Sequence, residues 1–358
     1  MAITIDVPQG EAALEEFVRF YDRVYSQHTA RWPAPVDLQL PILTGDSPFA
    51  RDRRIRPLLA RENGEIVARA AAVVDQRYIR HWNERLGHVV MFEALPEARE
   101  ATRALMDAAC TWLAQQGSEA ARTGMGMLDF PYVIDAYDTL PPSLLRHNPP
   151  YYHVLIKQAA FEAEQGFVDY KIRVTPALIE RWQRALDAAQ HVGYRIVPVK
   201  EIEPARRNRE FTATWNETFR AHWGWSPFAE DEIGMFFDAF VEGGIQDTSV
   251  LAYEGDEPVG MLFVNPDDPH HAVLAPGRAL DPAEKLNVLG IGVRERARGR
   301  GLNYAMAAYA FLELVRRGAA YVSYTLVLDD NWPSRRTGEG LGAYLCANYL
   351  AYRRNFCR

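Results

Sequence analysis

Late in the chain, Arg296, Gly299 and Gly301 follow one another at a spacing that suits anion binding. An apolar run before them predicts a strand over 286–293, and an amphipathic run after them predicts a helix over 304–317. Glycines one residue apart let the backbone turn tightly, so that successive N–H groups point inward, next to the positive end of a helix dipole. This strand, turn and helix predict a site for a phosphate or diphosphate.

Two other uses of glycine-rich turns are excluded by the surrounding residues. A dinucleotide-binding turn has the pattern G-x-G-x-x-G, and here the position three residues after Gly301 is Tyr304. A nucleoside triphosphate loop needs Gly-Lys followed by Ser or Thr, and the chain has no Gly-Lys pair. The remaining pattern, R-x-x-G-x-G directly after a strand, resembles the acyl-CoA signature of the GNAT superfamily of N-acetyltransferases.

This resemblance implies acetyl-CoA, or another acyl-CoA, as cosubstrate. The backbone amides of 298–303 would donate to the diphosphate, and nearby arginines would add charge-assisted contacts. The preceding strand would splay from its neighbour, so that the backbones of Ile291 and Val293 meet the pantetheine arm and polarise the thioester carbonyl. The expected contacts in the turn are Arg296, Arg298, Gly299, Arg300, Gly301, Leu302 and Asn303.

The sequence after the helix extends the resemblance. An apolar strand over 319–328 precedes Asn331 and Ser334, which the family places beside the CoA arm. Where many members have a tyrosine seven residues after the asparagine, to reprotonate the CoA thiolate, this chain has Gly338. That role is either lost or has moved to another residue. Three further positions match the family: Glu339, Leu341 and Gly342.

Acyl transfer to an amine needs a base that removes a proton from nitrogen and an acid that protonates the thiolate. His222 is the first candidate for the base, because imidazole titrates near neutral pH. Glu217 and Tyr344 are the other two candidates for catalysis. Other side chains with suitable chemistry near the expected site are Asp231, Tyr324, Glu339 and Cys346.

Aromatic residues are frequent just after His222. Packing in the core is their default role. The family's loop at this place caps the acceptor cavity, and an aromatic wall there suits an apolar or ring-bearing amine. The pattern therefore favours a small metabolite over a protein lysine as acceptor. The cluster consists of Trp223, Trp225, Phe228, Phe236 and Phe237.

The first half of the chain repeats the same order of elements without the glycine turn. An Asn63-Gly64 turn predicts a hairpin, and a strand over 88–93 leads to a helix over 96–116. Between this strand and helix lie glutamates, which repel phosphate. We predict an α/β (α+β) fold of two tandem GNAT-like domains, each a mixed central sheet flanked by helices, resembling the mycothiol synthases. The predicted units are a degenerate domain over 1–175, a linker helix over 176–195 and an acyl-CoA-binding domain over 196–358.

Composition sets limits on class and compartment. The chain has 358 residues, 48% of them hydrophobic, and its net charge of −7 argues against DNA binding. Three cysteines are too few and too scattered for a disulfide framework or a zinc site, so no metal is expected. Neither a signal peptide nor a long apolar run is found, which predicts a cytoplasmic protein without membrane contact. Monomer and homodimer both remain open.

The function predicted is direct transfer of an acyl group, in the first instance acetyl, from CoA to an amine of a small molecule. An aminoacyl-tRNA-dependent transferase is the alternative within the enzymes, kept open by arginine clusters near the C-terminus. A non-catalytic CoA sensor is the alternative outside the enzymes, kept open by Gly338.

Overall fold

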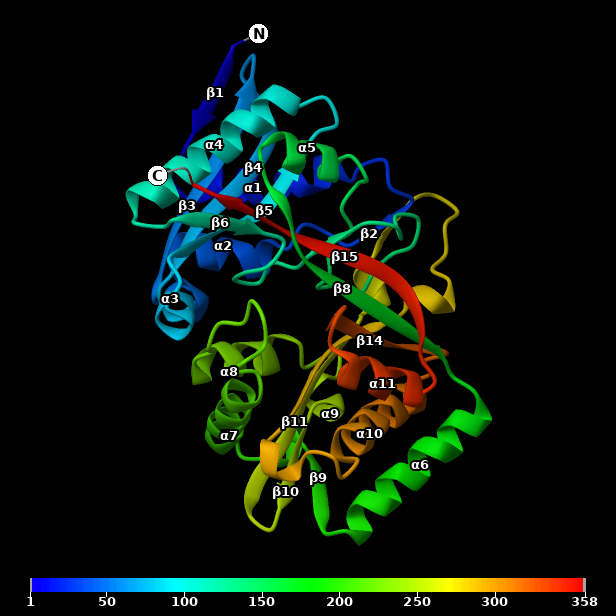
Figure 1. Cartoon of the computed structure of the whole chain (residues 1–358). Helices are drawn as coiled ribbons and strands as arrows, with labels where there is room; N and C mark the ends of the chain where they lie inside the picture. The colour runs from blue at the N-terminus through cyan, green and yellow to red at the C-terminus, as the bar shows by residue number, and fades with distance from the viewer. Residues whose placement is uncertain (1, 357–358) are drawn as a thin grey trace.

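The computed structural model describes residues 2–356, which form two lobes stacked end to end (Figure 1). No helix within these residues is long and apolar enough to cross a membrane. The first lobe is built from β1 (Ile3–Asp6), α1 (Glu11–Val24), β2 (Ala30–Arg31), α2 (Val36–Thr44), β3 (Arg53–Glu62), β4 (Glu65–Asp75), α3 (Gln76–Trp82), β5 (Leu86–Ala94), α4 (Arg99–Gln115), β6 (Ala120–Thr123), β7 (Tyr132–Val133) and α5 (Tyr152–Gln158).

The second lobe is built from the elements that follow β8 (Glu162–Arg173). These are α6 (Pro176–His191), β9 (Tyr194–Pro198), α7 (Pro204–Thr218), α8 (Glu230–Ala239), α9 (Ile245–Thr248), β10 (Val250–Glu254), β11 (Glu257–Pro266), β12 (Val273–Leu274), β13 (Asn287–Val293), α10 (Leu302–Arg316), β14 (Tyr321–Leu328) and α11 (Trp332–Gly340). The last strand is β15 (Tyr344–Asn355).

Turn and cap residues explain where several elements begin. Asn63 and Gly64 both have positive φ, 51° and 90°, and join β3 to β4 as the predicted hairpin. Thr175 caps α6, its side chain accepting from the Leu178 N–H, and proline follows it at the first helical position. Gly301 adopts a left-handed conformation directly before α10, so that this helix starts two residues earlier than its apolar pattern predicts.

The sheets confirm the predicted mixed α/β class and add an exchange of strands. One sheet has the order β1-β3-β4-β5-β6-β15-β8-β14, and a second has the order β13-β11-β10-β9. The end of β15 pairs with β6 of the first lobe, at Tyr352 opposite Thr123, and its start pairs with β8 at Lys171. Strands β8 and β15 therefore run through both lobes (Figure 1). A helix, α6, occupies the predicted linker, while the division into domains stays a prediction.

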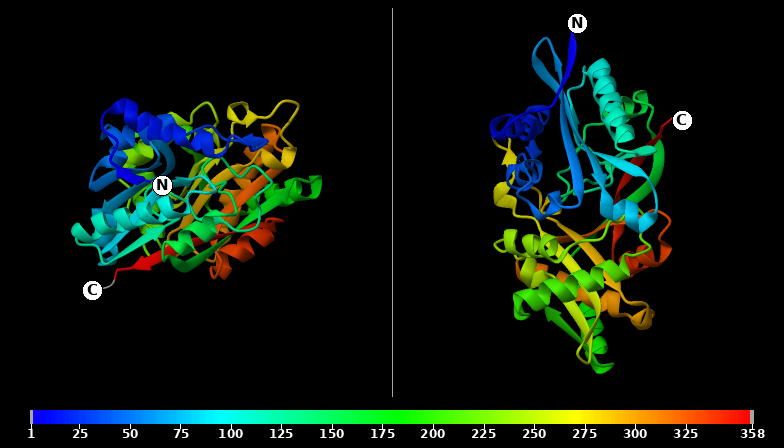
Figure 2. Two further views of the ribbon diagram at one scale, coloured as in Figure 1. Left: turned by 90° about the horizontal axis from the view of Figure 1, so that it is seen from above. Right: turned by 90° about the vertical axis from the view of Figure 1, so that its left-hand side faces the viewer.

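Helices pack on both faces of the sheets. Figure 2 shows α1 and α4 on opposite faces of the first sheet, and α4 packs on β3 and β4 through residues such as Leu105 and Leu113. On the other face, Phe17 of α1 belongs to an apolar cluster that continues into the second lobe through Phe211 of α7 and Phe237 of α8. Burying apolar surface between the lobes stabilises their relative position.

Candidate active site

The main opening in the second lobe lies between β13 and β14. These strands are edges of different sheets, and side chains replace the missing ladder at one end. Asn287 bonds to the backbone of Ser323 at 2.9 and 3.0 Å. The Thr325 hydroxyl accepts from the Leu289 N–H at 2.9 Å. The two strands are thus fixed together at this end by side chains.

The free edge of β13 continues past this closure. Backbone hydrogen-bonding groups alternate in direction along an antiparallel strand, so Ile291 and Val293 direct theirs to the same edge as Leu289. The Val293 carbonyl accepts from Nε of Arg298 at 3.0 Å. Ile291 also lines a cavity, described below, so its edge is within reach of a ligand. This is the arrangement that the sequence predicts for the pantetheine arm.

Gly290 and Gly292 of β13 allow close packing by helix α7. An added Cβ would lie 2.8 Å from the Trp215 ring at Gly290, and 2.1 Å from the Thr218 hydroxyl at Gly292. Helix α7 therefore packs directly on the β13 backbone at these glycines.

The glycine turn follows β13 through the short 3₁₀ helix η5 (Glu295–Ala297). Gly299 and Gly301 have φ of 75° and 76°, and nothing lies within 4 Å of the Cβ that either could carry. Glycine is needed at these two positions for its backbone conformation, and the space that a side chain would occupy is open. The first N–H groups of α10, from Leu302 onward, have no partner within the helix, as in any helix N-terminus.

The three arginines of the turn already have protein partners. Arg296 pairs with Glu257 at 2.7 Å, and Arg300 pairs with Glu254 at 3.2 Å. Both arginines are about half exposed, which keeps such pairs weak and exchangeable. An incoming phosphate can therefore replace these carboxylates. Asn303 is turned to α11, donating to the Thr337 hydroxyl at 2.9 Å.

Helix α11 closes the opposite side of the opening. Asn331 caps it, accepting from the Ser334 N–H at 3.2 Å, and both residues line the cavity. The Ser334 hydroxyl lies 2.9 Å from the hydroxyl of Tyr324, a buried residue of β14. Burial raises the pKa of Tyr324 to about 12. A Cβ at Gly338 would lie 3.3 Å from the Tyr324 ring, so the missing side chain leaves room for this phenol.

One cavity of about 380 Å³ joins this opening to the first lobe. Its second-lobe end is lined by Gly290 and Ile291, and its first-lobe end by Arg69, Glu93 and Arg146. The predicted aromatic cluster divides here: Trp225, Phe228 and Phe236 line the cavity, whereas Trp223 and Phe237 pack elsewhere. Aromatic residues that form its walls include Trp32, Trp215, Phe219, Trp225, Phe228 and Phe236.

Of the three main catalytic candidates, His222, Glu217 and Tyr344, His222 alone lines this cavity, and Tyr324 from the further candidates lines it too. Its Nδ1 lies 3.2 Å from the Trp223 carbonyl oxygen, and burial lowers the pKa of the ring. Glu217 lies outside, its carboxylate 3.0 Å from Arg294. Tyr344 is 49% exposed at the start of β15, also outside the cavity. The structure thus brings His222 together with Ile291, Asn331 and Ser334, and it leaves Glu217 and Tyr344 apart.

The corresponding strand edge of the first lobe is closed by side chains. Arg146 donates to the Phe92 carbonyl at 3.1 Å, and the Ala94 N–H donates to the Tyr152 hydroxyl at 2.9 Å. The Tyr151 hydroxyl donates to the Ala94 carbonyl at 2.7 Å. These groups occupy the backbone positions that β13 leaves open. The sequence has no local pattern that predicts this closure, because its side chains are more than 50 positions away from β5 in the chain.

Sequence reasoning missed the contribution of the first lobe to the cavity. Arg69 and Glu93 are buried charged residues on adjacent strands, and their Cα atoms are register partners. The pattern that could have predicted this contribution is a charged residue inside an apolar strand, since such residues are rarely buried without a function or a partner.

The open edge of β13, the glycine turn at the N-terminus of α10 and the cavity beside them together form the candidate site. Residues 208–343 match the model of the acetyltransferase (GNAT) family. This segment, which is less than half of the chain, is thus similar to the GNAT acetyltransferases.

Comparisons with known proteins give a partial sequence match and a shared fold. Over 183 residues, 50% of this chain, the sequence is 22% identical to Protein YghO of Escherichia coli (strain K12), and the match covers 47% of that protein. The chain thus matches about half the length of this curated relative. A tandem GNAT protein from the clavulanic acid biosynthesis pathway shares the fold over 99% of this chain and 98% of its own, with a TM-score of 0.58 and 13% identity.

Two further solved structures share the fold. A GCN5-related N-acetyltransferase from Sphaerobacter thermophilus has a TM-score of 0.56 and 14% identity, over 99% of this chain and 95% of its own. A glucosamine N-acetyltransferase region of a fungal multi-domain enzyme has a TM-score of 0.59 and 16% identity, over 98% of this chain and 38% of that one. The tandem arrangement is therefore confirmed, and the particular resemblance to mycothiol synthases stays a prediction.

Proposed function

We propose that the protein transfers an acyl group, in the first instance acetyl, from CoA to an amine bound in the cavity between the lobes. The observation that carries this proposal is a continuous cavity, which joins the open edge of β13 at Ile291 to a polar compartment in the first lobe. A donor and an acceptor can thus meet at one point, and positioning of this kind is a large part of catalysis.

CoA fits the second lobe by the chemistry of the groups there. The turn from Gly299 and the N-terminus of α10 would hold its diphosphate, and the β13 edge would pair with its pantetheine amides. A backbone N–H near Val293 would stabilise the negative charge that develops on the thioester oxygen. Asn331 and Ser334 would lie beside the same arm.

Two side chains of the cavity have suitable protonation for acid and base roles. His222 is the proposed base, because its lowered pKa keeps the imidazole neutral near pH 7, and Nε2 has no hydrogen-bond partner among residues 2–356. Tyr324 is the proposed acid in place of the absent tyrosine at 338, because its raised pKa keeps the phenol protonated. The amine proton would pass to His222 and the phenol proton to the CoA sulfur, as the C–N bond forms and the C–S bond breaks.

The two alternatives receive little support from the structure. Several of the C-terminal arginines that favoured tRNA pair with acidic side chains, for example Arg353 with Glu84 and Arg354 with Asp107, both at 2.6 Å, while Arg358 lies outside the described residues. The CoA-sensor alternative was based on Gly338, where many family members have a tyrosine. Tyr324 places a phenol beside α11, the helix that carries Gly338.

A panel of small amines with acetyl-CoA tests the proposal directly. We expect thiol release that depends on both the protein and one class of amine, with a shallow dependence on salt. Tight CoA binding with no turnover of acetyl-CoA or of longer acyl-CoA would favour the sensor. A steep salt dependence of acceptor binding would favour tRNA.

A further inference from the structure

We propose that Arg69 and Glu93 of the first lobe form an acceptor subsite for hydroxyl groups, so that the substrate is an amine carrying hydroxyls. This inference rests on the proposed acyl transfer and assigns its acceptor a chemical class. It also gives the first lobe a role: its strand β5, closed to CoA, takes part in acceptor recognition instead.

Arg69 supplies unused hydrogen-bond donors. The residue is 1% exposed and lines the cavity. Its Nη1 donates to the Phe17 carbonyl at 2.9 Å and to the Gln39 amide oxygen at 3.3 Å. Neither Nε nor Nη2 has a hydrogen-bond partner among residues 2–356, and no carboxylate there lies within 4.0 Å. A buried guanidinium with free donors is costly unless a ligand uses them.

Glu93 supplies an unused acceptor beside these donors. Its Oε2 accepts from the hydroxyls of Tyr25 and Tyr152, at 3.0 and 2.6 Å. Its Oε1 has no donor within hydrogen-bond distance in the described chain, and the nearest cation is Arg146 at 3.8 Å. Since Arg69 and Glu93 are register partners on β4 and β5, a free donor and a free acceptor lie on the same face.

Charge favours a neutral ligand group at this end of the cavity. Two guanidinium groups, Arg69 and Arg146, face two carboxylates, Glu93 and Asp129, of which Asp129 is bonded to Arg146. A ligand carboxylate would approach Glu93, and a ligand ammonium would approach Arg69, each leaving one excess charge in a buried compartment. A hydroxyl both accepts and donates without adding charge, so it satisfies the two free groups together.

The remaining walls suit a carbon framework between the hydroxyls and the amine. Phe219, Phe228 and Trp215 line the same cavity, where the Trp215 ring packs on Gly290 of β13 and contacts the other two rings. Aromatic faces pack against C–H groups and exclude water from the reacting amine.

Three amines that share one ring test this subsite: cyclohexylamine, 4-aminocyclohexanecarboxylate, and an aminocyclitol with a hydroxyl on each other ring carbon. Each is added to the full-length protein saturated with CoA for thermal-shift measurements, and with acetyl-CoA for rates. We expect the aminocyclitol to give the largest shift in Tm and to exceed cyclohexylamine about tenfold or more in kcat/KM. Glu93→Gln and Arg69→Met should reduce this preference to about threefold or less, and Arg56→Met, at an exposed position of β3, should preserve it.

The outcomes separate this inference from the function on which it rests. Binding of CoA, followed by calorimetry, reports the proposed function alone. If CoA binds and the three amines respond equally, or the carboxylate or the plain amine responds most, or none responds, the subsite assignment is wrong. Retention of the full preference in Glu93→Gln, which keeps the shape of the side chain, would also overturn it.

Discussion

At the scale of single residues, the proposed chemistry depends on His222 and Tyr324. His222 was the first candidate for the base from its residue type. Tyr324 was one of several further candidates by residue type, and its contacts in the structure distinguish it: its hydroxyl lies 2.9 Å from that of Ser334, and its ring packs where a side chain at position 338 would begin. The absence of a side chain at Gly338 and the position of the Tyr324 phenol are therefore linked, because the Tyr324 ring occupies the space that a side chain at 338 would need.

Exchanging these two residues tests the role of Tyr324. Tyr324→Phe should lower kcat about a hundredfold and leave KM for CoA nearly unchanged, because a general acid acts in the transition state. Gly338→Tyr alone should also impair the enzyme, since the new ring crowds Tyr324. Placed in Tyr324→Ala, however, Gly338→Tyr should restore at least part of kcat, while Tyr309→Phe on α10 should have no effect. Equal activity of Tyr324→Phe and the wild type would rule out the phenol as acid.

The pH dependence of the rate tests His222. Its pKa is lowered by burial, so the neutral ring that accepts a proton persists below pH 6.5. The rate should therefore stay constant as the pH falls from 8 to about 6.5 and decline only below this value. His222→Gln should lower kcat/KM about a hundredfold or more and remove this decline. A profile of the same shape in the variant would place the base elsewhere.

At the scale of elements, the opening depends on a bulge in β14. The pairing of β14 with β8 shifts between Tyr324 and Val327, and Leu326 has a φ of 48°. Asp169 of β8 holds this bulge by accepting from the Leu326 N–H, and it also accepts from the Tyr349 hydroxyl at 3.1 Å. Thr325, which lies between Tyr324 and Leu326, is thereby directed to β13, where it closes one end of the opening.

Asp169 makes this bulge sensitive to pH. Burial raises its pKa to about 7, whereas an unfolded chain ionises near 3.9. Its contribution to the free energy of unfolding is therefore complete below about pH 4 and decreases as the pH rises to about 7. Denaturant unfolding should show a loss of a few kcal/mol over this range relative to Asp169→Asn. If the free energy of unfolding changes equally with pH in the two proteins, Asp169 is ionised throughout this pH range.

The elements also show how far sequence patterns reach. Local signals found the hairpin at Asn63-Gly64, the helix α6 and the turn before α10, because each is decided by neighbours in the chain. The β14 bulge and the Arg146 closure were not predicted, because each joins residues far apart in sequence. For the same reason, Glu217 and Tyr344 suited catalysis by residue type and yet lie outside the cavity.

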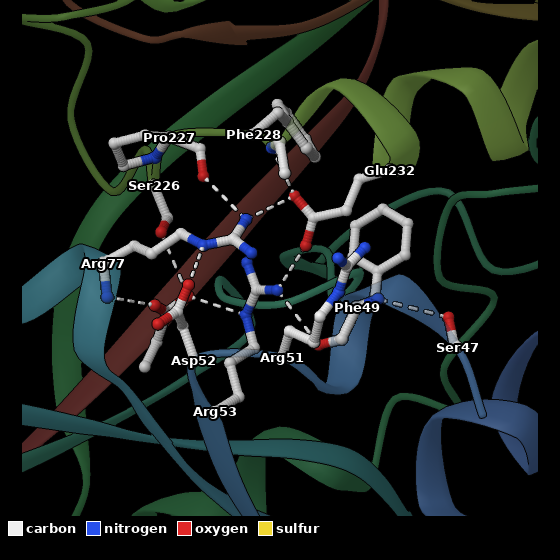
Figure 3. A network of polar contacts seen from close by, with 12 residues as sticks. Ser47, Phe49, Arg51, Asp52, Arg53, Arg77, Ser226, Pro227, Phe228 and Glu232 are labelled. Atoms are coloured by element: carbon white, nitrogen blue, oxygen red, sulfur yellow. Dashed lines mark hydrogen bonds and ion pairs between the residues drawn. The ribbon is translucent and has the colours of Figure 1, made fainter. Parts of the chain in front are cut away.

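At the scale of the whole molecule, an ion-pair network joins the two lobes (Figure 3). Glu232 of α8 is fully buried and pairs with Arg53 at 2.5 Å and Arg77 at 2.6 Å, both from the first lobe. Arg53 also pairs with Asp75 at 2.9 Å, and Asp75 accepts from the Ser226 hydroxyl at 3.0 Å. The loop that carries His222 to Phe228 is thus tied to the first lobe.

Removing one member of this network should loosen the lobes. Glu232→Ala leaves two buried guanidinium groups without their shared carboxylate, and breaking a buried pair in this way costs about 3–5 kcal/mol. Denaturant unfolding should show this loss, and KM for the amine should rise more than KM for CoA. Glu230→Ala, at an exposed position of the same helix, is the control. An unchanged stability of Glu232→Ala would mean that the apolar cluster alone joins the lobes.

The central claim is that CoA binds at the β13 edge and the glycine turn of the second lobe, and nowhere in the first. Calorimetric titration of CoA into the full-length protein tests it most directly. We predict one site per chain, weakened about tenfold or more by Gly301→Ala, because alanine strains the positive φ on which the diphosphate turn depends. Gly277→Ala, at a positive φ in a distant loop, should leave affinity unchanged. No uptake of CoA, or uptake that survives Gly301→Ala and is abolished by Arg146→Met in the first lobe, would contradict the account.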